Sequence, residues 1–180
     1  MSKVLVVVYS RTGTSRRLAE QLCSRLGWQL AEIVEERPRS GILGVFRCVL
    51  DSLLRRRPAI RYDGPFPKNF DVVVLVSPIW LGRLAAPMRS FVTRRRDHLP
   101  DLAVISVAGG TGQFAVAAEI ADLVGETPIV STTFTAREID DGTCAGRLQF
   151  FGAALNSAEA THAAARRHVH PPKMAATRST

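Results

Sequence analysis

The chain has 180 residues, of which 46% are hydrophobic and 22% are charged, which is typical of one globular domain with its own core. No apolar run reaches the roughly 18 to 20 residues that a membrane-spanning helix needs, so no membrane span is expected. The formal net charge is +8 and comes mostly from arginine, which indicates either an anionic ligand or partner, nucleic acid included, or an arginine-rich composition without a function.

The first part of the chain predicts a strand, a helix and a second strand. Val4–Tyr9 is a continuous Val-rich run, typical of a strand buried in a parallel sheet. A polar loop follows, and leucines spaced by four residues predict a helix over 15–26 that ends at Gly27. Residues 28–34 form a shorter second strand.

The middle of the chain predicts a helix over 42–56 and an irregular connector over 59–70. The clearest strand of the chain covers 71–77. Pro78 follows at once, so we expect the strand to stop there and residues 78–86 to form a loop.

The remainder alternates in the same way. In chain order it predicts a helix from Pro87 to about residue 98, a strand over 102–107, a helix over 114–123, a strand over 128–135, a turn over 140–142 and an Ala-rich helix over 143–167.

Five strands that alternate with five helices predict an α/β fold, a three-layer, doubly wound, five-stranded parallel sheet. We expect one domain over 1–167 and a flexible C-terminal tail over 168–180, which is rich in small polar residues and proline. Ligands of such sheets bind beyond the carboxyl ends of the strands. The loops after the first, third and fourth strands are therefore expected to converge on a site.

The first of these loops, residues 10–15, predicts an anion site. Four hydroxyl side chains surround Gly13, and the loop has no acidic residue. Unpaired backbone N–H groups at a helix start bind phosphate, and hydroxyls add further donors. Arg16 and Arg17 oppose the helix dipole in the first turn, and a phosphate would remove that conflict. The alternative is a simple cap by Thr14 or Ser15, which explains only one hydroxyl.

Other phosphate sites are excluded. The chain has neither the GxxxxGK[ST] loop nor the GxGxxG turn, and no arginine stands six residues after a cysteine. The first strand also ends without the acidic residues of a response-regulator receiver.

The cysteines and histidines give little support to a metal site. No CxxC pair occurs, and the odd, widely spaced cysteines are typical of a protein of the reducing cytoplasm: Cys23, Cys48 and Cys144. The C-terminal histidines are expected to be solvated: His162, His168 and His170. Arginine runs at 55–57 and 94–96 lie near helix ends, where cations suit the dipole, and without interleaved aromatic residues they give nucleic acid binding weak support.

The second and third loops offer contacts for a planar ligand. Trp80 lies just beyond a predicted strand end, where it is either a stacking platform or folds back onto its own domain. Gly82 permits a close approach or a positive φ. Residues 108–112 contain three glycines, whose backbone amides can approach a ligand closely or simply form a flexible turn.

Together and in order, these segments resemble the flavodoxin family. Residues 9–15 are similar to its phosphate loop, 71–82 to its third strand and isoalloxazine loop, and 85–91 to the helix that follows. The resemblance implies strand order 2-1-3-4-5, a short-chain form and bound FMN. It implies that the ribityl phosphate is held by Ser10, Arg11, Thr12, Gly13, Thr14 and Ser15. It implies that the ring lies along Pro78, Ile79, Trp80, Leu81 and Gly82, with Ala108, Gly109, Gly110 and Thr111 at its other edge.

Two departures from electron-carrier flavodoxins bear on the function. The third loop lacks the aromatic and acidic residues that close their flavin site, and this chain is basic where they are acidic. The resemblance therefore favours an FMN-dependent oxidoreductase that passes electrons from NAD(P)H through the flavin to a quinone or other small acceptor. A one-electron carrier that docks on an acidic redox protein and a flavin-free regulatory or binding module remain alternatives. No catalytic side chain, metal or nucleic acid is expected, and the oligomeric state is left open, a homodimer included.

Overall fold

A computed structural model of the chain describes residues 2–36, 50–52, 54–108 and 113–169. The strands within these ranges are β1 (Val4–Tyr9), β2 (Gln29–Glu35), β3 (Ile60–Asp63), β4 (Val72–Trp80), β5 (Arg83–Leu84), β6 (Asp101–Val107) and β7 (Val130–Phe134). The α-helices are α1 (Thr14–Leu26), α3 (Ala86–Arg95), α4 (Gln113–Val124), α5 (Ala136–Asp140) and α6 (Ala145–Val169), and the short 3₁₀ helices are η1 (Pro67–Asn69) and η2 (Arg96–His98).

One sheet organises the described chain, in the order β3-β2-β1-β4-β6-β7, with β5 paired to β4. Neighbouring strands among β2, β1, β4, β6 and β7 are parallel. If these five parallel strands alone are numbered in chain order, they lie in the sheet in the order 2-1-3-4-5. The predicted α/β fold with a mostly parallel sheet is confirmed. Two additional strands are antiparallel, since β3 pairs with β2 and β5 pairs with β4.

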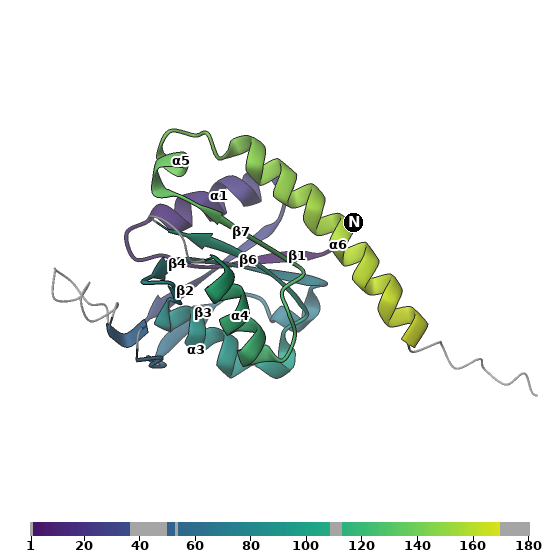
Figure 1. Cartoon of the computed structure of the whole chain (residues 1–180), viewed down its shortest axis with the longest axis horizontal. Helices are drawn as coiled ribbons and strands as arrows, with labels where there is room; N and C mark the ends of the chain where they lie inside the picture. The colour runs from purple at the N-terminus through teal and green to yellow at the C-terminus, as the bar shows by residue number, and fades with distance from the viewer. Residues whose placement is uncertain (1, 37–49, 53, 109–112, 170–180) are drawn as a thin grey trace, which may run out of the picture.

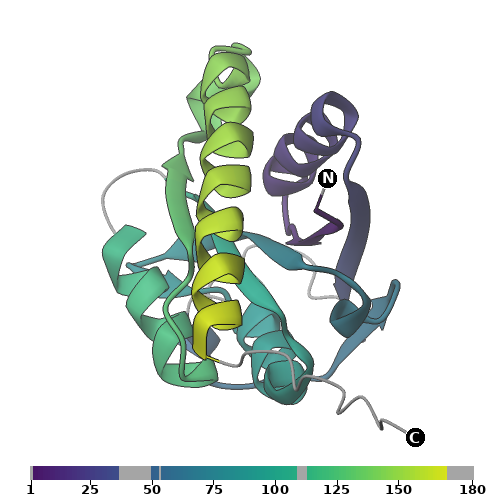
Figure 2. The same ribbon diagram turned by 90° about the vertical axis from the view of Figure 1, so that its right-hand side faces the viewer.

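Helices cover both faces of the sheet, with α1, α5 and α6 on one side and α3 and α4 on the other (Figure 1). Figure 2 shows the same layers after a quarter turn. Every residue of β1 is buried. Val6 and Val8 pack with α1 and α6, while Leu5 and Val7 pack with α3 and α4. Strand β1 is apolar at every position because each of its faces packs in a separate hydrophobic core.

Helix α1 follows the predicted pattern closely. Leu18 and Leu22 are fully buried in the core. Gly27 ends the helix in the left-handed conformation, with φ 68°, and its N–H donates to the carbonyl of Cys23. Glycine adopts this conformation without the Cβ clash that other residues meet, so the predicted stop is confirmed.

Strand β4 continues past Pro78, where the sequence predicts a stop. The pairing of β4 with β1 ends at Val76, but its pairing with β6 continues to Pro78 opposite Val107. Proline lacks an N–H donor and is tolerated where a strand has an unpaired side. At Pro78 the strand is paired with β6 on one side and is unpaired on the other, so the proline does not end the strand.

Two further elements depart from the sequence analysis. Strand β3 lies inside the predicted irregular connector, and with four residues it is too short to produce a clear alternation. Helix α5 lies just before the predicted turn at 140–142 and begins with a capping box, in which Thr135 and Glu138 bond each other's backbone N–H. That spacing is readable in the sequence. Of the predicted helix over 42–56, residues 42–49 and 53 lie outside the described part of the chain.

The C-terminal half of α6 is anchored at the amino ends of the strands. Arg166 contacts both carboxylate oxygens of the buried Asp101, at 3.0 and 2.8 Å, and His162 Nδ1 lies 3.1 Å from Asp101 Oδ1. His162 is exposed, as expected, with 45% of its side chain accessible, and it also contacts the carboxylate at the first position of β6. The side chains of His168 and His170 lie outside the described part of the structure.

None of the described helices is long and apolar enough to cross a membrane.

Candidate functional site

Three predicted site segments follow adjacent parallel strands. Strand β4 lies between β1 and β6, so the carboxyl ends of all three strands share one edge of the sheet. Residues 10–15 follow β1, residues 78–82 lie at the end of β4, and Ala108 follows β6. The remaining predicted contacts, Gly109, Gly110 and Thr111, lie outside the described residues.

The loop after β1 leads into α1 through a left-handed glycine. Gly13 has φ 91°, and among the described residues no side chain caps the helix. Its own N–H donates to Ser10 Oγ at 3.1 Å, which closes the loop. The first backbone N–H groups of an α-helix have no acceptor inside the helix. The simple cap by Thr14 or Ser15 is therefore not formed. The backbone N–H groups of the first turn of α1 point out of the start of the helix.

The four hydroxyls of this loop have different surroundings. Ser15 is 2% exposed, so its hydroxyl lies inside the protein. Ser10 accepts the loop-closing bond. Thr12 is exposed and Thr14 is half-buried, and their hydroxyl oxygens lie 3.4 Å apart. Thr12 and Thr14 are therefore the hydroxyls best placed to meet a ligand from solvent.

The arginines of the first turn of α1 are paired with carboxylates. Arg16 lies 2.9 Å from Glu20 and 3.2 Å from Glu32, and the hydrogen bond with Glu20 raises the pKa of its guanidinium. Arg17 lies 2.6 Å from Asp140 of α5. The predicted conflict with the helix dipole is thus balanced by side chains of the protein itself, and these arginines give no independent sign of a phosphate.

The end of β4 and the short strand β5 form a tight β-hairpin, where the sequence predicts an open loop. Ile79 pairs with Leu84 and Trp80 with Arg83, which leaves Leu81 and Gly82 as the turn. Both turn residues have positive φ, at 50° and 72°. This is the two-residue turn that suits the twist of a hairpin. Leu81 is 72% exposed, so the hairpin presents an apolar tip at the edge of the sheet.

Trp80 is half-buried and lies against the end of β1. Its ring packs partly on the core and meets the ring of Tyr9. The Tyr9 hydroxyl in turn donates to Glu35 Oε1 at 2.6 Å. Trp80 therefore sits beside the strand that leads into the loop of residues 10–13.

The structure contains a buried group that the sequence analysis did not identify. Arg89 and Glu119 form an ion pair behind the hairpin, with 1% and 6% of their surfaces exposed. Residues 86–92 of α3 are all buried. An arginine within an apolar run that begins a helix is the signal that could have pointed to it. No group of three or more His, Cys, Asp or Glu side chains in the described ranges is arranged to hold a metal ion.

The fold is similar to that of solved flavoproteins. A flavoprotein from Lactobacillus acidophilus NCFM in complex with FMN superposes with a TM-score of 0.66 at 21% identity, over 78% of this chain and 98% of that one. The apo form of the flavoprotein from the same organism gives a TM-score of 0.56 at 22% identity, over 78% and 96% of the two chains. A WrbA-like flavodoxin from Agrobacterium tumefaciens gives 0.51 at 13% identity, over 88% and 98%.

The chain therefore has a flavodoxin-like fold. No protein-family model and no curated protein sequence matches it.

Proposed function

We propose that this chain binds FMN at the carboxyl edge of its sheet and acts as an oxidoreductase, passing electrons from NAD(P)H to a quinone or another small acceptor. The observation that carries the proposal is the start of α1, where Gly13 leaves the first helical turn without a side-chain cap among the described residues. An uncapped helix start with no acidic residue is a binding site for an anion such as a phosphate.

The residues at this edge fit the two ends of FMN. Backbone N–H groups of the first turn of α1 and the hydroxyls of Thr12 and Thr14 would hold the phosphate. The hairpin offers apolar surface for a flat ring, with half-buried Trp80 and exposed Leu81. The solved neighbour from L. acidophilus carries FMN, which supports this ligand for the same fold.

Bound FMN supplies the redox chemistry, and the protein supplies anchoring, orientation and a local environment. The hydroxyls and amides of the first loop bind and orient the phosphate end. The apolar hairpin excludes water from the side of the ring that it covers. The proton that quinone reduction consumes besides the hydride of NAD(P)H would come from solvent, so the proposal needs no side-chain acid or base.

The absorbance spectrum of the purified protein tests the proposal. We expect visible flavin absorbance, either as purified or after FMN is added and free flavin is removed. The loaded protein should then oxidise NADH or NADPH steadily in the presence of a quinone. A protein that takes up no FMN would be the flavin-free binding module instead.

A second candidate is a one-electron carrier that docks on an acidic redox protein, and the net charge of +8 favours it. Exposed arginines occur in groups, at 55–57 and at 94 and 96. A carrier would bind FMN without steady oxidation of NAD(P)H, and its electron transfer to an acidic partner would slow as salt is added.

Free Cys23 and Cys144 support a reducing compartment such as the cytoplasm.

A further inference from the structure

The Arg89–Glu119 pair joins α3 to α4 inside the protein. Arg89 Nε donates to Glu119 Oε1 at 2.6 Å, and both side chains are more than nine-tenths buried. Helix α3 follows the hairpin of residues 79–84, and α4 begins at residue 113, directly after the third predicted site loop. The pair therefore links the two helices that leave two of the site segments.

The same pair holds the returning arm of the hairpin by its backbone. The N–H of Leu84 donates to Glu119 Oε2 at 3.1 Å, and Arg89 Nη2 donates to the carbonyl of Leu84 at 3.0 Å. Leu84 is itself paired with Ile79, next to Trp80 in the hairpin. Displacement of either charged side chain would thus release the hairpin at a single residue.

Ser52 extends the cluster to a fourth segment of the chain. Its carbonyl accepts from Arg89 Nη2 at 3.3 Å, and its hydroxyl accepts from the N–H of Ala86 at 3.2 Å. Ala86 is the first residue of α3. Ser52 therefore satisfies a donor at the start of the helix that carries Arg89.

The energetics indicate a role in orientation. A buried ion pair is a weak source of stability, because desolvation of two charges offsets much of their attraction, whereas loss of one partner is severe. Arg89 Nη1 has no hydrogen-bond partner within the described residues. The pair does orient the backbone of Leu84. The guanidinium of Arg89 binds the Leu84 carbonyl, and the carboxylate of Glu119 binds the Leu84 N–H.

We propose that Arg89 and Glu119 are positioning residues for the flavin ring: they fix the hairpin that carries Trp80 relative to α4. This inference rests on the proposed function. Both residues are buried and would act on the ring through the backbone of Leu84, which they hold by its N–H and its carbonyl.

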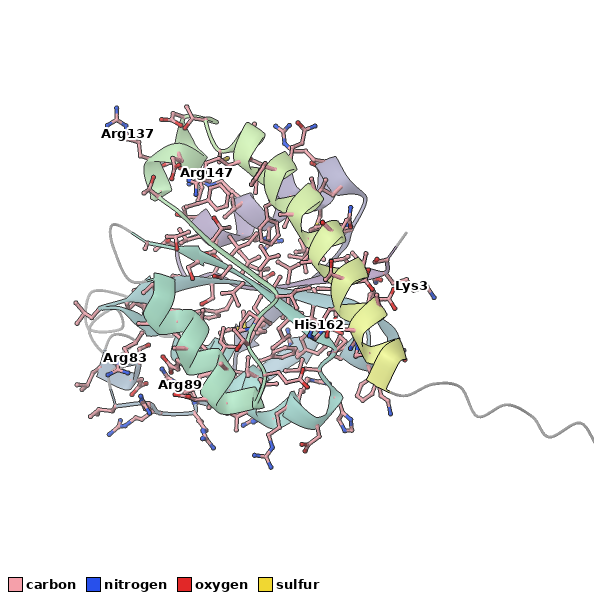
Figure 3. All side chains as sticks on the ribbon, turned by 45° about the vertical axis from the view of Figure 1, so that its right-hand side comes forward. Lys3, Arg83, Arg89, Arg137, Arg147 and His162 are labelled. Atoms are coloured by element: carbon pink, nitrogen blue, oxygen red, sulfur yellow. The ribbon has the colours of Figure 1, made fainter. Side chains whose placement is uncertain are left out.

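The test compares two buried carboxylates that each pair with an arginine, although Arg89 is buried and the side chain of Arg166 is 55% exposed. Glu119→Gln removes the charge that faces Arg89 and leaves one amide N–H opposed to a donor. Asp101→Asn removes the charge that faces Arg166, at the amino ends of the strands. Figure 3 shows Arg83 and Arg89 at the opposite end of the molecule from Lys3 and His162, the latter a neighbour of Asp101. Arg89→Lys, which keeps the charge but loses the fork, is a milder second variant.

Two readouts separate positioning from folding. Hydrogen exchange of the Leu84 amide in the apo protein should accelerate in Glu119→Gln and Arg89→Lys but not in Asp101→Asn. The Kd for FMN, measured where each variant is folded, should rise about tenfold or more in the first two and stay within about twofold in the third.

The inference is overturned if Asp101→Asn weakens FMN binding as much as Glu119→Gln, or if exchange at Leu84 is unchanged in both hairpin variants. If the wild-type protein binds no FMN, the proposed function fails, and unequal exchange at Leu84 would still establish the anchor on the hairpin.

Discussion

The ring of Tyr9 meets the ring of Trp80 edge-on, with centroids 6.3 Å apart and planes at 89°. Tyr9 is the last residue of β1, directly before the loop of residues 10–13, and Trp80 is the last residue of β4. The hydroxyl of Tyr9 is held by Glu35 at the end of β2. This edge-to-face contact joins the proposed phosphate loop to the proposed ring loop, so a change in one is expected to be felt in the other.

Replacement of Trp80 should alter the bound flavin. We expect Trp80→Ala to weaken FMN binding by roughly 0.5–1.5 kcal/mol, the usual value of an aromatic contact, and to change the visible absorbance or the quenching of flavin fluorescence. Trp28, the other tryptophan of the chain, directly precedes the first residue of β2 and provides the control. If Trp28→Phe changes the flavin spectrum as much, Trp80 is only a packing residue.

Loss of the hydroxyls in the first loop should remove hydrogen bonds to the phosphate end of FMN. Thr12→Ala with Thr14→Ala removes two donors and should weaken FMN binding by about 1–3 kcal/mol, because hydrogen bonds to a charged group exceed those to a neutral one. Titration with riboflavin, which lacks the phosphate, should give the same Kd for wild type and variant. Thr161→Ala, whose hydroxyl bonds Ser157 of α6, is the matched control. An equal loss for riboflavin and FMN would contradict the placement.

A side chain at Gly13 should strain the backbone and destabilise the protein. The Gly13 φ of 91° lies in the left-handed region, so Gly13→Ala should lower the free energy of unfolding by roughly 1–2 kcal/mol although nothing lies within 4 Å of the added Cβ. Gly146 has equally open surroundings but lies near the start of α6 without a positive φ. Gly146→Ala should be neutral or stabilising by up to about 1 kcal/mol. Urea denaturation of both variants measures the difference, and equal effects would refute the conformational explanation.

The described cysteines should react slowly with alkylating agents. Burial raises the pKa of the Cys23 thiol to about 11 and also raises the pKa of Cys144. The thiolate is the reactive form, so little of it is present near pH 8 in the native protein. Iodoacetamide labelling followed by peptide mass spectrometry should show slow modification at both positions, with rapid modification after unfolding. Rapid labelling of the native protein at either cysteine would contradict this.

The strands at the centre of the sheet were predictable because burial on both faces requires an unbroken run of apolar residues. Residues 4–8 and 72–76 are apolar throughout, since both faces of the sheet are covered by helices. The end of α1 at Gly27 was predictable because one residue type suits the left-handed stop. The position of the three strand ends at one edge followed from parallel pairing.

Other features depend on neighbours far away in the chain. Pro78 remains in a strand because β1 has already ended beside it, which local propensity does not reveal. The short strand β3 exists because β2 offers it an edge. Arg16 and Arg17 are balanced by carboxylates from β2 and α5 as well as from their own helix.

The sequence by itself determined an α/β sheet, the loop chemistry at residues 10–15 and the presence of Trp80 near a strand end, because these follow from periodicity and residue type. Only the tertiary structure decided which hydroxyls remain near solvent, that residues 79–84 form a hairpin, and that Arg89 and Glu119 hold it at Leu84. The physical reason is that burial and ion pairing join residues 30 or more positions apart, such as Arg89 with Glu119 and Leu84 with Glu119.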